Sequence, residues 1–284
     1  MIHRVPHFSI YFGDAQDNIN KATDFKSSDQ SLLRLEKFEH LSSYGLQELA
    51  FLNQTHSTYG MIIEKEIPAF NIEGDFLITN QKNIGIGVMT GDCLPIIFYD
   101  QKNNVIGIAH AGWKGSVAGV AQKTIAAMHD AFDTQASDLQ IFFGPSAREC
   151  CYEVQEDFVR NFENDLVRSS RSKPERLSRG KRTFAPLESA LHSLEFILSM
   201  SKEGEREPHF YSLPNVLYKN ILINRDQKFY FDLSALNRLQ LIDVGVHEAA
   251  INSDYNLCTI CNHQFCSYRR TCNDNRQMTI VWLH

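Results

Sequence analysis

Three separated segments of the chain each place a potential metal ligand at the end of an apolar run. They are FLNQTHS, VMTGDCLP and IAHAGWKGS, which carry His56, Cys93 and His110. Loops that follow strands are where a rigid scaffold tends to expose catalytic groups. Two imidazoles and one thiolate form a suitable Zn²⁺ set, and three protein ligands leave the fourth position that catalytic zinc needs. These residue types predict an open zinc site, with burial of the three side chains in the core as the alternative.

Other polar residues near these motifs suit a role in orienting a ligand or binding an anion. Asp92 either orients a ligand through a hydrogen bond or caps a turn. Lys114 lies in a glycine-rich turn before an expected helix start, where a phosphate would be favoured. Arg269 and Arg270 follow an apparent strand, and their planar guanidinium groups suit either phosphate oxygens or a structural carboxylate. Three further residues suit either contact with the substrate or a structural role in the fold: Trp113, Tyr152 and Glu153.

The cysteines near the C-terminus raise the question of a second metal. Cys258 and Cys261 have the spacing of half a structural zinc site, but no second CxxC pair accompanies them. The spacings of His263, Cys266 and Cys272 match no standard zinc finger. All seven cysteines are expected to be reduced, because the chain is long and their number is odd. We therefore expect burial of the C-terminal cysteines as small apolar residues.

The elements that must position these groups are mainly short strands. Between residues 75 and 143, β-rich runs alternate with one helical run, and the expected strands are FLIT, IGIGVM, LPIIFYD, VIGIAH and LQIFFG. Apolar residues at intervals of three and four predict a helix from Ser116 to Phe132. A second helical stripe spans residues 187–198, and the basic segment 165–186 is expected to be a surface loop. Later residues indicate a strand at 229–233, then a helix and another strand.

Composition limits the classes of protein that fit. The chain has 284 residues, of which 43% are hydrophobic and 22% charged, with a net charge of −6. These values are typical of soluble globular proteins and argue against wholesale nucleic-acid binding. No apolar run is long enough for a signal peptide or a membrane span. We expect a cytoplasmic protein with neither a membrane nor a nucleic acid as partner, whereas the oligomeric state cannot be read from the sequence.

Several motifs resemble, in collinear order, those of the YfiH/YlmD/laccase-domain family, described as multicopper polyphenol oxidase-like and later as purine nucleoside phosphorylases. They are DFLIT, TGDCLPIIFYD, VIGIAHAGWKGS, FFGPSARECCYEV, YFDLSALN and CTICNHQFCSYRR, and they extend from about Asn53 to Leu283. The resemblance implies an α+β fold, a four-layer α/β/β/α sandwich with mixed sheets. It further implies a single domain over 1–284, with an insertion at about 168–228 that is atypical of the family. Departures at Gly91, Lys114, Cys266 and Asn275 concern substrate fit more than metal binding.

The same resemblance implies that His56, Cys93 and His110 hold the metal, with Zn²⁺ favoured over copper. The implied reaction joins phosphate to adenosine, inosine, guanosine or 5′-methylthioadenosine and yields the base and ribose 1-phosphate, with adenosine deamination as a side activity. Cys93, His110 and Asp92 would be catalytic, and substrate and phosphate would be bound by Lys114, Arg269 and Arg270.

Three other functions remain open on the residues alone. One is a cysteine hydrolase with Cys93 as nucleophile and His110 as base. Another is a laccase-like copper polyphenol oxidase, although multicopper oxidases need many more His ligands than three. The last is a binding module without enzymatic activity. His56 separates the first from a metal enzyme, because a Cys–His dyad does not need a second imidazole.

Overall fold

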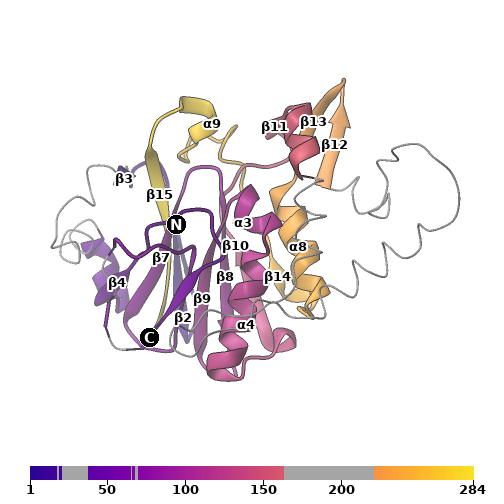
Figure 1. The fold of residues 1–284 in the computed structure, drawn as a ribbon. Coiled ribbons are helices and arrows are strands. Elements are labelled where there is room, and N and C mark those ends of the chain that lie inside the picture. Colours follow the sequence, from indigo (N-terminus) through magenta and orange to yellow (C-terminus); the bar gives the residue numbers. More distant parts are fainter. Residues whose placement is uncertain (18, 21–37, 65, 68–69, 163–220) are drawn as a thin grey trace, which may run out of the picture.

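The computed structural model describes residues 1–17, 19–20, 38–64, 66–67, 70–162 and 221–284. Two six-stranded sheets of mixed strand direction pack face to face, and helices cover the outer face of one of them (Figure 1). The expected α+β fold with mixed sheets is thus confirmed. The stripe at 187–198, the basic segment at 165–186 and most of the proposed insertion at 168–228 lie outside the described residues. The single-domain organisation stays a prediction.

The C-terminal strand lies in the middle of the first sheet. β15 (Asn275–Leu283) pairs with β2 (Phe8–Phe12) on one side and β7 (Ile84–Thr90) on the other, both antiparallel. The outer strands are β1 (Ile2–Arg4) beside β2 and β4 (Glu48–Ala50) beside β7, and β3 (Ile19–Asn20) pairs with the start of β15. Both ends of the chain therefore contribute strands to the same sheet.

The second sheet contains four of the five strands expected between residues 75 and 143. Its order is β14 (Ile251–Asn252), β10 (Leu139–Phe143), β8 (Leu94–Asp100), β9 (Val105–Ala111), β6 (Phe76–Thr79) and β5 (Gly60–Ile63). Every residue of β8 and β9 is buried, because the first sheet covers one face and helices the other. Continuous apolar runs such as LPIIFYD are typical of strands covered on both faces.

Three buried clusters hold these layers together. Ile10 of β2, Val88 of β7 and Ile108 of β9 belong to the cluster between the two sheets. On the outer face of the second sheet, the core includes residues of α4 (Val120–Phe132) and α8 (Leu233–Asp243). On the outer face of the first sheet, the 3₁₀ helix η1 (Glu39–Tyr44) contributes Leu41 to a third cluster. The described residues thus include helix and sheet layers, while the four-layer count stays a prediction.

Two local expectations were wrong. The helix expected from Ser116 to Phe132 is divided into α3 (Trp113–Val117) and α4, because Gly119 has a φ of 82° and interrupts the helical backbone. Arg269 and Arg270 do not follow a strand but lie in the short helix α9 (Tyr268–Thr271), and β15 comes after them. The Ser267 side chain accepts a hydrogen bond from the Arg270 amide and so caps the start of α9.

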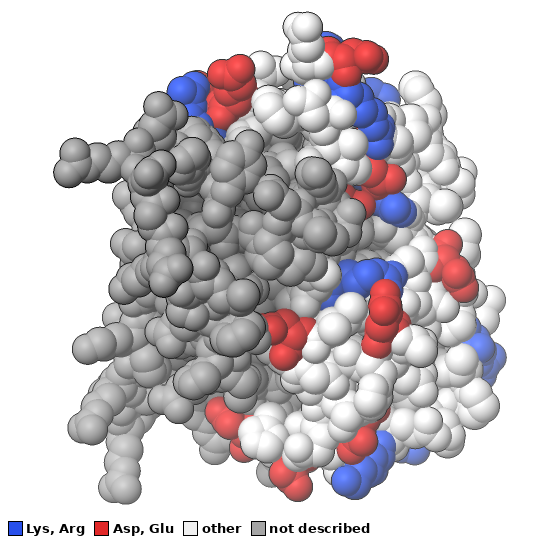
Figure 2. All heavy atoms as spheres, turned by 90° about the vertical axis from the view of Figure 1, so that its right-hand side faces the viewer, with Lys and Arg blue, Asp and Glu red and all other residues white. Residues whose placement is uncertain are grey.

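A third, small sheet stands apart from the other two. In it, β13 (Lys228–Phe231) lies between β11 (Glu153–Val154) and β12 (Leu222–Arg225). The described residues also include two short 3₁₀ helices, η2 (Ala136–Asp138) and η3 (Glu248–Ala250), and a helical stretch at 156–162. On the described part of the face shown in Figure 2, basic and acidic side chains are interspersed. No helix among the described residues combines the length and apolar character needed to cross a membrane.

Candidate metal centre

Strand register brings two of the three expected ligands to adjacent strand ends in the second sheet. Cys93 directly precedes β8, and His110 is the penultimate residue of β9. In the antiparallel pairing of these strands, Leu94 lies opposite Ala111 and Pro95 opposite His110. Cys93 and His110 therefore belong to the same end of one hairpin, although neither residue type determines the register.

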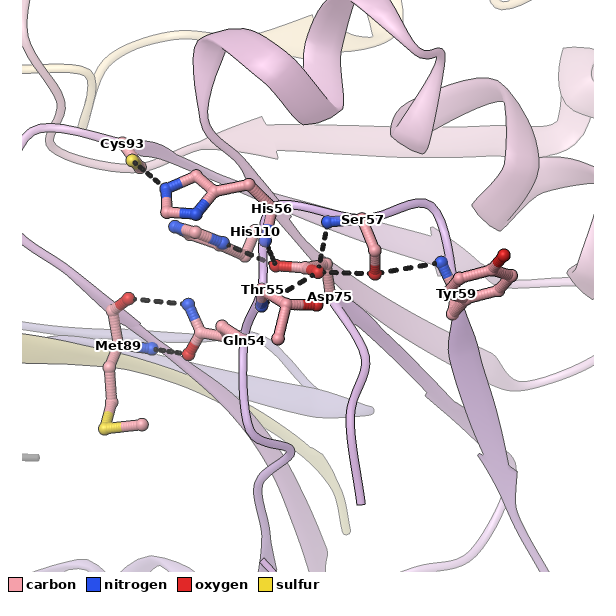
Figure 3. Close-up of polar contacts among 9 residues, drawn as sticks. All are labelled: Gln54, Thr55, His56, Ser57, Tyr59, Asp75, Met89, Cys93 and His110. Carbon is pink, nitrogen blue, oxygen red and sulfur yellow. Dashed lines mark hydrogen bonds and ion pairs between the residues drawn. The ribbon is translucent and has the colours of Figure 1, made fainter. Parts of the chain in front are cut away.

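The third ligand, His56, arrives on the loop between β4 and β5, and this loop is folded around Asp75. The Asp75 carboxylate is buried and accepts hydrogen bonds from the backbone amides of Thr55 at 3.2 Å, His56 at 3.0 Å and Ser57 at 2.6 Å. The Ser57 hydroxyl donates a fourth bond at 2.7 Å (Figure 3). His56 itself has a left-handed φ of 61°. One buried carboxylate thus fixes the backbone that presents His56.

The three ligand residues form one cluster, as the sequence predicted. One donor atom from each of His56, Cys93 and His110 lies within 4.8 Å of the others, and Cys93 Sγ lies 3.7 Å from His56 Nε2. His110 is 3% exposed, Cys93 is partly buried and His56 is exposed. The cluster is therefore closed at His110 and open to solvent at His56.

Asp75 also orients His110. Its Oδ1 lies 2.8 Å from His110 Nδ1, and its backbone oxygen accepts the His110 amide at 2.7 Å. This contact follows from the register, because Phe76 of β6 lies opposite Ala109 of β9. With Nδ1 held by the carboxylate, His110 can offer Nε2 to a metal, in the carboxylate–histidine arrangement found around many bound metals.

The electrostatics of the cluster favour a thiolate. Burial opposes ionisation of Cys93, but His110 and His56 outweigh it and lower the thiol pKa to about 6. Burial likewise opposes the protonated form of His110, but the Cys93 charge and the Asp75 hydrogen bond raise its pKa to about 9. Burial would raise the pKa of Asp75, yet bonds from His110 and Ser57 lower it to about 2. Without a metal these shifts describe a Cys93 thiolate beside a protonated His110. The thiolate is already the form that binds metal, whereas His110 would release its Nε2 proton when a metal binds.

Gly112 makes room for the cluster. A Cβ atom added there would lie 2.5 Å from His56 Cδ2 and 3.0 Å from Cys93 Sγ. Backbone strain does not explain why a glycine stands here, because its φ of −72° suits any residue. The close approach of the His56 and Cys93 side chains explains it, since a larger residue would collide with them. The HAGWKG motif thus contributes both His110 and the space that the side chains of His56 and Cys93 occupy.

Asp92 makes different contacts from those of a residue that orients a metal ligand. Its Oδ1 accepts the Thr259 hydroxyl at 2.7 Å and its Oδ2 accepts the Arg269 amide at 2.7 Å. Asp92 therefore ties the C-terminal segment to the β7–β8 turn, and its catalytic role stays a prediction. The orienting carboxylate is Asp75, which the sequence analysis missed. In the sequence, the only local indication of this role is that Asp75 directly precedes an apolar run. A carboxylate buried at such a position needs several hydrogen-bond partners.

Arg269 and Tyr152 border the cluster. The Arg269 guanidinium lies 5.0 Å from the centre of the Tyr152 ring, and Arg269 Nη1 donates to the Glu153 carbonyl at 3.0 Å. Burial, followed by the negative charge of Cys93, raises the pKa of Tyr152 to about 12. The Tyr152 hydroxyl therefore stays protonated near neutral pH and interacts electrostatically with both Cys93 and Arg269.

The remaining cationic candidates have other surroundings. Lys114 is exposed on α3, and its Nζ lies 5.7 Å from the centre of the Trp113 ring. Trp113 also contacts Phe158 edge to face at 5.0 Å, which agrees with a packing role. The Arg270 guanidinium donates to the backbone carbonyls of Thr259, Ile260, Asn262 and Phe265. Arg270 thus holds the preceding turn together, and phosphate binding by either cation stays a prediction.

The expected burial of the C-terminal cysteines was wrong for most of them. Cys266 is buried, but Cys258 is only partly buried, and Cys261 and Cys272 are exposed. These residues lie in turns or at a helix end between β14 and β15, so no strand carries them into the core. Cys258 and Cys261 instead approach Cys150 and Cys151, and the four sulfur atoms lie within 4.8 Å of one another.

The sequence of the chain matches the family described as multi-copper polyphenol oxidoreductase laccase over residues 18–194 and 210–284. The chain belongs to this family. One relative of this laccase-family chain is a purine nucleoside phosphorylase of Clostridium acetobutylicum, 33% identical over 160 residues, which are 56% of this chain and 65% of that protein. The match therefore spans slightly less than two thirds of the clostridial protein. A purine nucleoside phosphorylase of Borreliella burgdorferi is 26% identical over 238 residues, covering 83% of this chain and 80% of its own.

Another relative of the laccase-family chain carries a different activity in its name. Adenosine deaminase RL5, from an unknown prokaryotic organism, is 33% identical over 136 residues, covering 43% of this chain and 52% of that protein. The names of these relatives support an enzyme of this family, and the His and Cys cluster is a candidate metal centre for it.

Solved structures agree with the YfiH-like fold. The YfiH protein of Bacillus licheniformis matches with a TM-score of 0.66 at 20% identity, covering 98% of this chain and 93% of that one. YlmD of Geobacillus stearothermophilus matches with a TM-score of 0.62 at 20% identity, covering 98% and 91%. These structures confirm the fold, and the family match over residues 18–194 and 210–284 confirms the expected membership of the YfiH/YlmD/laccase-domain family.

Proposed function

We propose that this chain is a zinc-dependent purine nucleoside phosphorylase. The single observation that carries the proposal is the open cluster of His56, Cys93 and His110, oriented by a buried carboxylate, in a chain whose relatives bear that activity in their names. Adenosine, inosine, guanosine and 5′-methylthioadenosine are the proposed nucleosides. The products are the free base and ribose 1-phosphate.

The donor set fits zinc. Two imidazoles and one thiolate are borderline-soft ligands, and three protein ligands leave a position open. The low pKa of Cys93 and the fixed Nδ1 of His110 prepare two of these ligands, while Gly112 leaves space for them. Zinc held there would supply a Lewis acid that polarises an atom of the bound nucleoside. Copper is the weaker proposal, because a multicopper oxidase needs many more imidazoles than the two of this cluster.

The residues around the cluster have suitable roles in phosphorolysis. A phosphate oxygen attacks the anomeric carbon of the ribose while the bond to the purine nitrogen breaks, and the bonding electrons leave with the purine. The guanidinium of Arg269 would hold the phosphate from one side, and the mobile ammonium of Lys114 would add positive charge. Tyr152, protonated near neutral pH, would donate a hydrogen bond to the purine as negative charge develops.

Adenosine deamination is proposed as a side activity, because one relative is named an adenosine deaminase. Deamination needs water in place of phosphate as the attacking group. An open coordination position and a solvent-exposed His56 are compatible with either nucleophile. The two reactions would thus share His56, Cys93 and His110 and differ in their dependence on phosphate.

A specific arrangement favours one further candidate, a cysteine hydrolase. Cys93, His110 and Asp75 have the order of a thiol nucleophile, its base and the carboxylate that orients the base. His56 does not belong to such a triad, yet it also contacts the Cys93 sulfur. A metal centre explains all three side chains around the thiolate, whereas a triad leaves His56 without a role.

The test is a product analysis on protein of known metal content. Adenosine is incubated with and without phosphate: adenine and ribose 1-phosphate that form only with phosphate support phosphorolysis, and inosine formed in both samples identifies deamination. Variants His56→Ala and Cys93→Ser are compared with His7→Ala, an exposed histidine outside the site.

The expected result is that each site variant holds one zinc ion per chain fewer than wild type and loses phosphorolysis, while His7→Ala keeps the wild-type zinc content and activity. A Cys93→Ser variant with the zinc content of wild type would contradict the proposed ligand set. Phosphate-independent turnover that survives loss of this zinc in His56→Ala, but is abolished in Cys93→Ser, would instead identify the cysteine hydrolase.

A further inference from the structure

Four cysteines from two distant parts of the chain meet outside the site described above. Cys150 and Cys151 follow β10, whereas Cys258 and Cys261 follow β14. Their sulfur atoms all lie within 4.8 Å of one another, and the Sγ atoms of Cys150 and Cys261 are 4.0 Å apart although 111 residues separate them. This four-cysteine cluster shares no residue with the cluster around Cys93.

The backbone holds the two segments together independently of the sulfur atoms. Ser146 and Cys258 form an isolated parallel bridge, with the Ser146 amide donating to the Leu257 carbonyl at 3.1 Å and the Thr259 amide to the Ser146 carbonyl at 2.9 Å. The Arg148 guanidinium adds a bond to the Asn256 carbonyl at 2.7 Å. The four thiols are therefore brought together by a fixed backbone.

The spacing of the sulfur atoms suits a metal. In a tetrahedral Zn²⁺ site with Zn–S bonds of about 2.3 Å, neighbouring sulfur atoms are roughly 3.8 Å apart. The 4.0 Å between Cys150 and Cys261 is close to that value, and the remaining separations require only small side-chain adjustments. A disulfide would need these two atoms to approach to about 2.05 Å.

Backbone amides also face the cluster. Those of Cys261, Arg148 and Ile260 donate hydrogen bonds to the Cys258 sulfur. Four thiolates gathered at this distance would repel one another, and a divalent cation bound among them would remove that repulsion.

We propose that Cys150, Cys151, Cys258 and Cys261 bind a second zinc ion as a closed, structural tetrathiolate site. A Cys₄ set fills all four tetrahedral positions, so this ion would have no position for substrate. Its task would be to join the turn after β10 to the segment between β14 and α9. Thr259, next to Cys258, donates to Asp92, which also accepts the Arg269 amide. The structural zinc would thus help to position Asp92 and Arg269 beside the cluster of His56, Cys93 and His110.

The decisive measurement is the zinc content of the full-length Cys93→Ser variant after reconstitution in the presence of a thiol reductant. This variant keeps all four cysteines of the second site. We expect wild type to hold two zinc ions per chain and Cys93→Ser to hold one. Replacing that remaining ion with Co²⁺ should give the intense thiolate-to-cobalt absorption of a tetrahedral thiolate site.

The complementary variant is Cys258→Ser with Cys261→Ser, and the matched control is Cys272→Ser, an exposed cysteine outside both clusters. The double variant should lose one zinc ion and keep the other, while the control keeps both. If the double variant fails to fold, thiol titration of wild type before and after chelation replaces it, and four thiols beyond Cys93 should become reactive on chelation.

Two outcomes would overturn the proposal. The first is a folded Cys93→Ser protein that holds no zinc and whose four cysteines react freely. The second is a disulfide between any two of them, found by peptide mapping of the reconstituted protein. Neither outcome depends on phosphorolysis, so failure of this inference is distinguishable from failure of the proposed function.

Discussion

The two clusters of potential metal ligands differ in their donors and in their surroundings. The cluster of His56, Cys93 and His110, which the proposed function makes the catalytic cluster, has two imidazoles and one thiol. It has an orienting carboxylate and an exposed member, and it lies beside Tyr152 and Arg269. The four-cysteine cluster has sulfur donors alone and joins two turns. An incomplete donor set suits chemistry, whereas a complete one suits stability. The comparison teaches that the donor set and its neighbours distinguish a cluster suited to an open metal site from one suited to a closed site within the same chain.

Metal removal should separate the two clusters most completely. Three ligands and an open position should release zinc to a chelator before four thiolates do, so brief chelation should abolish phosphorolysis while the thermal midpoint changes little. Prolonged chelation under reducing conditions should then lower the midpoint. Activity and calorimetry on the same samples measure both effects. A simultaneous loss of activity and stability would mean that the clusters are not functionally distinct.

Asp75→Asn should have the next largest effect. The asparagine side chain has the same shape, but an NH₂ group replaces one carboxylate oxygen. This group cannot accept the hydrogen bonds that the backbone amides of Thr55 and Ser57 donate, and the uncharged side chain holds His110 less well. We expect zinc affinity at the catalytic cluster to fall roughly 10–100-fold, as for other residues that hold a metal ligand. Competition with a chromophoric chelator measures it.

Asp100→Asn is the control for that variant. Asp100 is also a buried carboxylate that accepts backbone amides, from Lys102 and Asn103, but it lies at the opposite end of the β8–β9 hairpin from Cys93. Both variants should lose stability, and only Asp75→Asn should lose zinc affinity. Equal zinc affinity in the two would remove Asp75 from the metal centre.

Gly112→Ala should disturb the catalytic cluster through space alone. The added methyl would lie 2.5 Å from His56 Cδ2, so the imidazole must move, and such overpacking typically costs about 1–3 kcal/mol. We expect weaker zinc binding and lower kcat, with the four-cysteine zinc retained. Gly115→Ala is the control, because its nearest neighbour, the Ser57 carbonyl, is at 3.4 Å. Similar zinc affinities in the two variants would contradict the spatial argument.

Thr259→Val should have the smallest effect, because it breaks only the link between the clusters. Loss of the hydroxyl bond to Asp92 removes about 1 kcal/mol, which corresponds to roughly a fivefold change. We expect KM for phosphate to rise by that factor through a less well-held Arg269, with both zinc ions retained. Thr124→Val, which removes a buried hydroxyl bond within α4, should leave KM unchanged. A fall in kcat alone would argue against the positioning of Arg269.

The sequence was informative where a local pattern carries the information. The runs FLIT, LPIIFYD and VIGIAH predicted β6, β8 and β9 correctly, since strands covered on both faces are apolar throughout. The clustering of His56, Cys93 and His110 was also predicted, with support from the resemblance. Asp75 was missed because its partners arrive from a different loop and through strand register, which no local pattern encodes.

The four-cysteine cluster shows the same limit more clearly. The Cys258–Cys261 spacing was visible, but its partner is a pair of adjacent cysteines far away in the chain, and no standard spacing describes that combination. The break at Gly119 was also missed, because apolar periodicity continues across it while the backbone conformation does not.

The small sheet of β11, β13 and β12 has a consequence for how this protein can change in evolution. β11 and β12 are far apart in the sequence, yet both pair with β13. The pairing partners of both strands are therefore supplied by β13 and not by the residues between them in the sequence. The strands that assemble the catalytic cluster, β8 and β9, pair with each other before β11 begins. A change of sequence length between β11 and β12 would thus leave that pairing untouched, which makes this interval the natural place for lineage-specific insertions and for an engineered fusion partner.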